Sequence, residues 1–327
     1  MLAEIPNAPK DIIMFSSGMC HNLFYTKSKI WYGCGSNECG ELCESSGKDL
    51  KELTELKGLE GFEAKYFVCG SNYSAIITLD GSLYVMGETY STEPTKLPIN
   101  QKITFVSGGW NSLIAIPEGL GIYYCIDGDQ NIQFACPTIK FIDCGVGMSH
   151  FVSLTNEGEV YTWGEGNACG QGDDFYSSLP TKVNLTEDVK ISRVFASTYN
   201  TFLVDENNFI WVTGYNDDGM GGLGEIEKTS NFIKLKQFTH NKIVQICGGR
   251  YMNYVLTNKG ELFSSGNGED YKLLQEDDNN YNEFHACQLT KDKNVCYISS
   301  GSEHIIIGIN MNDEMINDIN DKKREIE

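Results

Sequence analysis

One short pattern recurs along the 327-residue chain and constrains its fold more than any other feature. A small residue is followed three positions later by a polar or aromatic residue, and an apolar run comes next. That third position is held by His21, Tyr73, Asn111, His150, Tyr199, Tyr251 and His304, at spacings of 52, 38, 39, 49, 52 and 53 residues. A repeat on this scale predicts one supersecondary unit that is stacked many times.

A second column of residues tests the first. It is aromatic in six copies, at Tyr32, Tyr84, Tyr123, Tyr161, Trp211 and Phe263, and each lies 11 or 12 residues after its partner. A constant offset inside a variable period indicates a fixed core joined by loops of variable length. The last copy, which begins at Gly301, lacks this aromatic segment.

The local signals in each copy are those of short strands. Asp80-Gly81 and Glu157-Gly158 place glycine where a tight hairpin needs a positive φ. Another glycine ends the aromatic segment, and a Pro-x-Lys element such as residues 94–96 suits an edge strand. An alternating apolar run precedes each small residue. We therefore expect about four short strands in each copy.

Four-stranded units of this length, repeated around an axis, form a β-propeller whose closure protects the sheet edges. We predict an all-β fold, a single seven-bladed β-propeller over residues 1–310. Its repeats are expected to start near residues 12, 64, 103, 139, 191, 243 and 295. N-terminal residues should close the ring by pairing with the strands of residues 295–309, and residues 311–327 should form a charged C-terminal tail.

The charge of the chain argues against several classes of partner. Its net charge is −20, whereas phosphate backbones are bound by clustered Lys and Arg, so we expect no binding to DNA or RNA. No apolar run approaches the ~20 residues that span a bilayer, and the first residues lack the pattern of a signal peptide. We expect a monomer in the cytoplasm that does not bind membranes, with the nucleus as the alternative location.

The sequence carries no sign of catalysis. The densest cysteine cluster, Cys34, Cys39 and Cys43, lacks the paired spacings of structural zinc sites, so we expect free thiols and no metal. The glycines near Gly164 lack the Gly-Lys-Ser/Thr of a phosphate-binding loop. The histidines of the repeat are spread over several copies and do not converge, so we interpret them as structural. We expect neither an enzyme nor a cofactor.

Three segments carry a family resemblance. The sequences GMSHFVSLTNEGEVYTWGEGNACGQG (147–172), GCGSNECGEL (33–42) and TGYNDDGMGGLG (213–224) resemble the regulator of chromosome condensation (RCC1) repeat. The resemblance covers about residues 10–309, although only Trp163 fills the family's Trp position. It implies a propeller that binds proteins. The founding member of the family is a nucleotide-exchange factor for the small GTPase Ran and also binds chromatin.

The chain departs from that member in features linked to its activity. The segment that matches the exchange wedge, residues 125–138, is short, and the basic N-terminal tail is absent. In that member, acidic residues in the loops before the repeat histidines contribute to Ran binding. Among the residues directly before the first column in this chain, only Glu303 is acidic. Our hypothesis is a protein-binding regulator or guanine-nucleotide exchange factor of a small GTPase. The alternative is an interaction scaffold or adaptor without exchange activity, and a hydrolase or transferase is disfavoured.

The loops before the first column should converge on one face of a propeller, where a partner could bind. They carry the candidate partner-binding residues Met19, Asn72, Trp110, Met148, Arg250 and Glu303. Trp, Arg and Met are enriched in protein interfaces. The alternative for each of these residues is a structural role as a plug at the mouth of the channel.

Two longer insertions interrupt the repeat. Residues 43–62 place Leu50, Leu53 and Leu56 at helical spacing, which predicts a short amphipathic helix. Residues 267–294 contain the polar run Glu276-Asp277-Asp278-Asn279-Asn280, which predicts a solvated loop.

Overall fold

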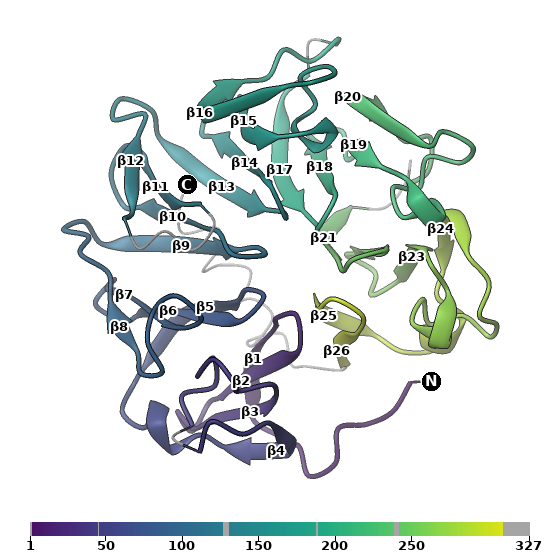
Figure 1. Cartoon of the computed structure of the whole chain (residues 1–327). Helices are drawn as coiled ribbons and strands as arrows, with labels where there is room; N and C mark the ends of the chain where they lie inside the picture. Colours follow the sequence, from purple (N-terminus) through teal and green to yellow (C-terminus); the bar gives the residue numbers. More distant parts are fainter. Residues whose placement is uncertain (1, 45, 127–130, 188, 239–241, 310–327) are drawn as a thin grey trace. The chain divides into compact units, whose positions relative to one another are not determined.

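The computed structural model describes residues 2–44, 46–126, 131–187, 189–238 and 242–309. Its chain forms two compact units, a N-terminal unit of residues 3–140 and a C-terminal unit of Leu2 with residues 141–309. All regular elements in these ranges are strands or single turns of 3-10 helix (Figure 1). No helix among them is long and apolar enough to cross a membrane. The predicted C-terminal tail, 311–327, lies outside the described residues.

The N-terminal unit consists of three antiparallel four-stranded sheets, each built from consecutive strands. The strands are β1(Ile12–Ser17), β2(His21–Thr26), β3(Trp31–Gly35) and β4(Leu50–Glu55); β5(Ala64–Cys69), β6(Tyr73–Thr78), β7(Leu83–Gly87) and β8(Thr95–Lys96); and β9(Ile103–Gly108), β10(Leu113–Pro117), β11(Ile122–Cys125) and β12(Gln133–Ala135). A 3-10 helix, η1(Lys57–Leu59), follows β4.

The C-terminal unit contains three more four-stranded sheets and one two-stranded sheet. The four-stranded sheets comprise β13(Phe141–Val146), β14(His150–Thr155), β15(Val160–Glu165) and β16(Tyr176–Lys182); β17(Ile191–Ala196), β18(Asn200–Asp205), β19(Ile210–Tyr215) and β20(Lys228–Lys234); and β21(Ile243–Gly248), β22(Met252–Thr257), β23(Leu262–Gly266) and β24(Tyr281–Ala286). The last sheet pairs β25(Val295–Ser300) with β26(Ile305–Ile309). Four 3-10 helices complete the unit: η2(Asn167–Cys169), η3(Asp217–Gly219), η4(Glu269–Tyr271) and η5(Gln288–Thr290).

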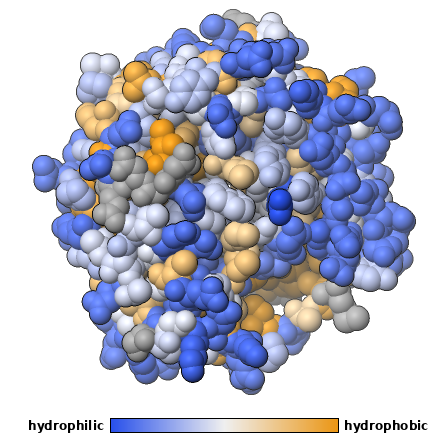
Figure 2. Space-filling view, viewed as in Figure 1, coloured by the Kyte–Doolittle hydropathy of each residue, from blue (hydrophilic) through white to orange (hydrophobic). Residues whose placement is uncertain are grey.

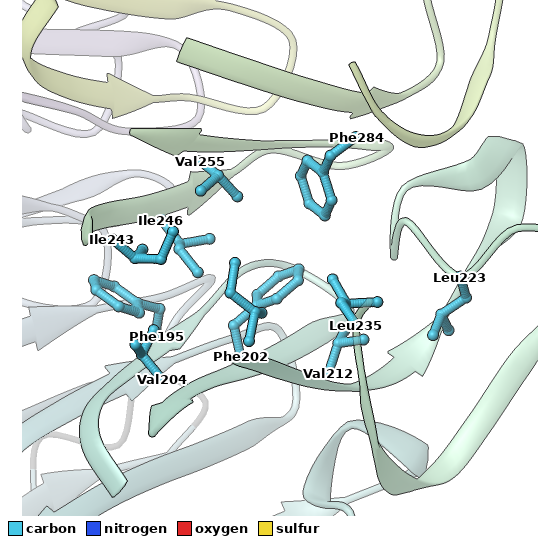
Figure 3. Close-up of a cluster of buried hydrophobic side chains, with 11 residues drawn as sticks. Phe195, Phe202, Val204, Val212, Leu223, Leu235, Ile243, Ile246, Val255 and Phe284 are labelled. Carbon is cyan, nitrogen blue, oxygen red and sulfur yellow. The ribbon is translucent and has the colours of Figure 1, made fainter. Parts of the chain in front are cut away.

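The hydrophobic core lies between successive sheets. Every residue is buried in the second strands β2, β10, β14, β18 and β22. In the cluster of Figure 3, Phe202 and Val212 of one sheet pack with Ile246 and Val255 of the next. Burial of each such side chain contributes roughly 1.5–3 kcal/mol before entropy is counted. The apolar alternation along each strand therefore gives every sheet two faces that need neighbours.

The all-β prediction is confirmed, but the prediction of seven four-stranded blades is wrong. Six sheets have four strands, and the described residues after Gly301 supply only β26. Residues 2–11 form no strand, so N-terminal pairing does not complete the last sheet. The physical reason is local, because Pro6 and Pro9 lack the N–H that a ladder needs and Asn7 turns the chain at a φ of 59°. The Leu2 side chain packs against the cluster of buried residues beside β25.

The predicted helix at residues 43–62 is also wrong. Leu50 and Leu53 lie in strand β4, which pairs with β3, and Leu56 is buried just before η1. Tyr32 pairs with Glu55 and Gly33 with Thr54, so the edge of β3 that faces away from β2 is paired with β4. The gain from sheet pairing outweighs the helix propensity of a Leu-, Lys- and Glu-rich segment. In the second insertion, residues 276 and 278–280 are exposed, as expected of a solvated loop. The prediction of a loop is wrong for the rest of residues 267–294, which form η4, strand β24 paired with β23, and η5.

Candidate functional site: the turns between first and second strands

The candidate residues lie in the turns that join the first strand of each sheet to its second, which we call the AB turns. In all seven sheets the N–H of a small residue donates to the carbonyl three residues later, at 2.8–2.9 Å. The small residues are Gly18, Gly70, Gly109, Gly147, Ser197, Gly249 and Gly301. The turn is tight, since a Cβ on Gly147 would lie 2.1 Å from Cε1 of His150.

The hydrogen bonds place three turns one residue later than the sequence pattern does. These turns close at Ser112, Asn200 and Met252, rather than at Asn111, Tyr199 and Tyr251. Those three residues are therefore turn residues, and all three are half-buried instead of enclosed in a sheet. Tyr199 and Tyr251 are therefore candidate binding residues that the repeat pattern, displaced by one residue, does not reveal.

A second constant offset in the sequence identifies the correct register. In five sheets the second strand starts opposite a glycine 14 residues later: the pairs are His21–Gly35, Tyr73–Gly87, His150–Gly164, Asn200–Gly214 and Met252–Gly266. Each glycine has a positive φ, and a Cβ on Gly164 would lie 2.2 Å from the carbonyl oxygen of Ser149. Only glycine fits there, so this residue marks the turn opposite it.

Neighbouring AB turns are hydrogen-bonded to one another within each unit. In the N-terminal unit the Met19 N–H donates to the Ser71 carbonyl at 3.2 Å, and the Ser71 N–H donates to the Trp110 carbonyl at 3.0 Å. In the C-terminal unit, Met148 donates to Thr198 at 3.0 Å and Arg250 to Ser302 at 2.9 Å. The backbone thus holds four of the residues that follow a small residue: Met19, Ser71, Met148 and Arg250.

The N-terminal unit brings Met19, Asn72 and Trp110 onto three successive turns, and all three are half-buried. The Asn72 side-chain amide donates to Glu88 Oε2 at 2.7 Å, and the Glu88 N–H donates to the Asn72 carbonyl at 2.9 Å. Asn72 therefore holds an exposed carboxylate beside its turn. The repeat pattern in the sequence does not mark Glu88 as a candidate binding residue.

The C-terminal unit places Arg250 between two tyrosines. The Arg250 Cζ lies 5.2 Å from the ring centroid of Tyr251, and the Tyr199 ring lies 6.3 Å from that of Tyr251. A hydrogen bond with the Tyr199 side chain raises the pKa of Arg250, so its charge persists at every accessible pH. Arg250 is exposed, and the three residues, which we call the Tyr–Arg cluster, form an aromatic surface with one fixed positive charge.

The remaining candidates in this unit have different surroundings. Glu303 is exposed, but its Oε2 lies 2.7 Å from Nζ of Lys272 in an ion pair. Met148 is half-buried and bonded through its backbone to the turn that carries Tyr199. The six predicted residues thus all lie on AB turns, and their role in binding a partner stays a prediction.

Two histidines of the repeat, His21 and His150, are buried, and His304 is half-buried. Nε2 of His21 lies 3.0 Å from Oγ of Ser74 in the next sheet. Burial lowers the pKa of His150 to about 4, although a hydrogen bond with the Asn200 backbone opposes that effect. Burial also lowers the pKa of His304. Burial therefore favours the neutral imidazole at His150 and His304.

No side-chain group in the described ranges fits a metal ion. Three or more His, Cys, Asp or Glu residues do not converge anywhere among the described residues. The cysteines are free thiols, and burial raises the pKa of Cys43 to about 11 and that of Cys69 to about 12.

The face shown in Figure 2 is mostly hydrophilic, with apolar side chains scattered over it.

Comparison with known proteins agrees with this architecture. Two models of the regulator of chromosome condensation (RCC1) repeat match residues 139–171 and 157–204. The Arabidopsis thaliana ultraviolet-B receptor UVR8 is 24% identical over 80% of this chain and 67% of its own length. A dog X-linked retinitis pigmentosa GTPase regulator is 29% identical over 41% of this chain and 13% of its own length. The chain spans between 6% and 67% of the length of the first curated relatives it matches.

The solved structure of Saccharomyces cerevisiae Prp20p shares the fold with a TM-score of 0.80. The likeness covers 96% of this chain and 86% of that chain at 17% identity. The repeat matches and this fold define the chain as an RCC1-like β-propeller.

Proposed function

We propose that this propeller is a protein-binding regulator of a small GTPase and that it contacts its partner through the AB turns of the C-terminal unit. The Tyr–Arg cluster carries the proposal. Tyr and Arg are the residue types whose truncation most often costs 2 kcal/mol or more at interfaces. Here both types lie on adjacent turns of a rigid sheet framework, a setting in which loops commonly bind partners.

The comparisons support a GTPase as the partner. The dog relative is named a GTPase regulator, and the yeast structure is described with its binding properties to Gsp1p and histones. Guanine-nucleotide exchange is the more specific form of the proposal. It requires that the bound propeller accelerate nucleotide release.

The experiment combines a binding assay with an exchange assay. Release of a fluorescent guanine nucleotide is followed for a panel of purified small GTPases, and binding is measured by biolayer interferometry. For the GTPase that binds, Arg250→Ala should weaken the affinity at least tenfold. Lys259→Ala is the matched control, because Lys259 is exposed on the same sheet but lies in the turn between β22 and β23. Equal effects of the two variants would remove the Tyr–Arg cluster from the interface.

An interaction scaffold without exchange activity is the second candidate. Glu303 favours the scaffold. It is the one acidic residue at the positions that the family resemblance links to GTPase binding, and its ion pair with Lys272 already neutralises its charge. The two candidates separate in the same assay. A GTPase that binds with no faster nucleotide release supports the scaffold, whereas a faster release supports the exchange factor.

The remaining properties belong to the same proposal. We propose that the chain is a monomer that does not bind nucleic acid, since its net charge is −20, and that it works in the cytoplasm or the nucleus. Light scattering after size exclusion tests the first property. Filter binding to duplex DNA and RNA at low salt tests the second, and imaging of the tagged chain in cells tests the third.

A further inference from the structure

The chain contains one Asn-Gly pair, Asn267-Gly268, and it lies beside the Tyr–Arg cluster. The pair directly follows β23, and the Asn267 N–H donates to the carbonyl of Tyr251 at 2.8 Å. An asparagine loses its side-chain amide when the backbone nitrogen of the next residue attacks its Cγ. Glycine favours that attack, because it has no Cβ to shield its nitrogen and its backbone is the most permissive. This pair is therefore the position in the sequence with the strongest intrinsic tendency to deamidate.

The fold orients the carbonyl group that is attacked in this reaction. The Glu269 N–H donates to Oδ1 of Asn267 at 3.1 Å. This hydrogen bond closes a short ring that contains both reacting atoms, Cγ of Asn267 and N of Gly268, so the side chain is folded back toward the attacking peptide. The same N–H stabilises the negative charge that develops on Oδ1 during the attack. The local structure thus favours the reaction.

Two neighbouring side chains oppose the reaction. Nδ2 of Asn267 donates to Oδ2 of Asp218 at 3.2 Å, and the Gly268 N–H donates to Oδ1 of Asn280 at 3.0 Å. The attack requires that Gly268 lose this proton, so Asn280 covers the hydrogen that a base must remove. Asn280 is itself held by Asp218, whose Oδ1 accepts a hydrogen bond from its Nδ2 at 3.0 Å. Asp218 therefore controls both restraints, and water reaches them because Asp218 and Asn280 are exposed.

We propose that Asn267 is a deamidation site of the folded protein and that Asp218 sets its rate. A base in solution takes the Gly268 amide proton, the nitrogen bonds to Cγ of Asn267, and the Cγ–Nδ2 bond breaks. The departing NH₂ group takes up one proton and leaves as ammonia. Water then opens the cyclic succinimide at either carbonyl, which yields aspartate or isoaspartate. The reaction needs no oxidant or reductant and does not depend on the proposed binding of a GTPase.

The product disturbs the contacts around the Tyr–Arg cluster. In aspartate a carboxylate replaces the amide that donated to Asp218, so a hydrogen bond becomes a repulsion between like charges. In isoaspartate the backbone is longer by one methylene at the residue whose N–H bonds to Tyr251. Glu269 and Asp270, both exposed, already place negative charge on the same loop. Deamidation should therefore loosen the link between η3 and the segment that leads into η4.

Peptide mapping of the full chain by mass spectrometry tests the site. After incubation of the folded protein at pH 8, the mass gain and the isoaspartate at Asn267 should appear at least tenfold faster than at Asn258. Asn258 is the internal control, because it is exposed in a turn of the same sheet but precedes Lys259 instead of glycine. Asn267→Gln should abolish the signal at this position, since attack on the longer side chain has to close a larger ring.

Substitutions test the control by Asp218. Asp218→Ala removes both restraints and should raise the rate at Asn267 at least fivefold, with the rate at Asn258 unchanged. Asp217→Ala is the matched control, because it removes an exposed carboxylate from the same 3-10 helix without touching either bond, and it should keep the wild-type rate.

A second variant keeps the test decisive if Asp218→Ala does not fold. Asn280→Ala uncovers the Gly268 N–H while Asp218 stays in place, and it should also raise the rate at Asn267. The proposal is overturned if Asn267 of the wild type reacts no faster than Asn258. It is also overturned if either folded variant, Asp218→Ala or Asn280→Ala, reacts at the wild-type rate.

Discussion

His150 should make the stability of the fold depend on pH in a way that one substitution removes. The ring is 3% exposed and begins β14, where burial lowers its pKa to about 4. The unfolded chain binds the proton with the ordinary pKa of 6.5. Protonation therefore favours the unfolded state. The contribution to stability is complete above pH 6.5 and is lost as the pH falls toward 4.

The size of the effect follows from the two pKa values. A difference of one pKa unit corresponds to about 1.4 kcal/mol, so the loss at pH 5 is about 2 kcal/mol and approaches about 3 kcal/mol near pH 4. That is a large part of the roughly 5–15 kcal/mol that separates folded from unfolded proteins. The neighbouring sheet shows a residue that the position tolerates, because Asn200 begins β18 in the same register.

Urea denaturation of the wild type and His150→Asn between pH 8 and pH 5 measures this effect, at pH values above the isoelectric point of 4.6. The difference between the two free energies of unfolding, variant minus wild type, should increase by about 2 kcal/mol when the pH is lowered from 8 to 5. His285→Asn is the control, since His285 is exposed on β24, and it should keep the wild-type profile. A constant difference between wild type and His150→Asn across this range would refute the burial of a neutral ring at this turn.

Three further substitutions test the repeat. Gly164→Ala should cost roughly 3 kcal/mol or more, because φ is +97° and the new Cβ would lie 2.2 Å from the Ser149 carbonyl oxygen. Gly166→Ala, at a φ of +90° and ψ of −178° with nothing within 4 Å, should cost about 1–3 kcal/mol for the backbone conformation alone, and a larger loss than for Gly164→Ala would contradict the close approach. Glu41→Gln should stabilise the fold by about 1–3 kcal/mol, because Glu41 is fully buried and its Oε1 has no hydrogen-bond partner. At the equivalent position of another sheet, the Gln171 side chain donates to Thr162 Oγ1 and to the Thr181 carbonyl. A urea midpoint at or below that of the wild type would contradict this assignment.

The repeat pattern predicts the period of the fold better than its phase. The pattern assigned His21, Tyr73, His150 and His304 correctly. It was displaced by one residue at 108–109, 196–197 and 248–249, where the first of two small residues was taken as the start of the turn. The displacement assigned Tyr199 and Tyr251 to strand starts and so concealed the aromatic neighbours of Arg250. The glycine 14 residues downstream resolves the ambiguity, because its close approach to the turn tolerates no side chain.

The other errors lie where long-range pairing decides the local structure. Leu50, Leu53 and Leu56 fit a helix on spacing alone, yet the free edge of β3 makes Leu50–Glu55 a strand. The count of seven four-stranded blades assumed that N-terminal residues complete the last sheet, but residues 2–11 form no strand. Ring closure joins the two ends of a sequence, and no local pattern specifies it.

The most direct test of the proposed binding surface is the hydrogen-exchange footprint of a bound small GTPase on the full chain. The proposal predicts that amides in residues 198–200, 249–251 and 302–304 exchange more slowly in the complex. Those of the turn at residues 258–260, at the other end of strand β22, should be unchanged. Slower exchange at residues 258–260, with unchanged rates at the AB turns of the C-terminal unit, would contradict it.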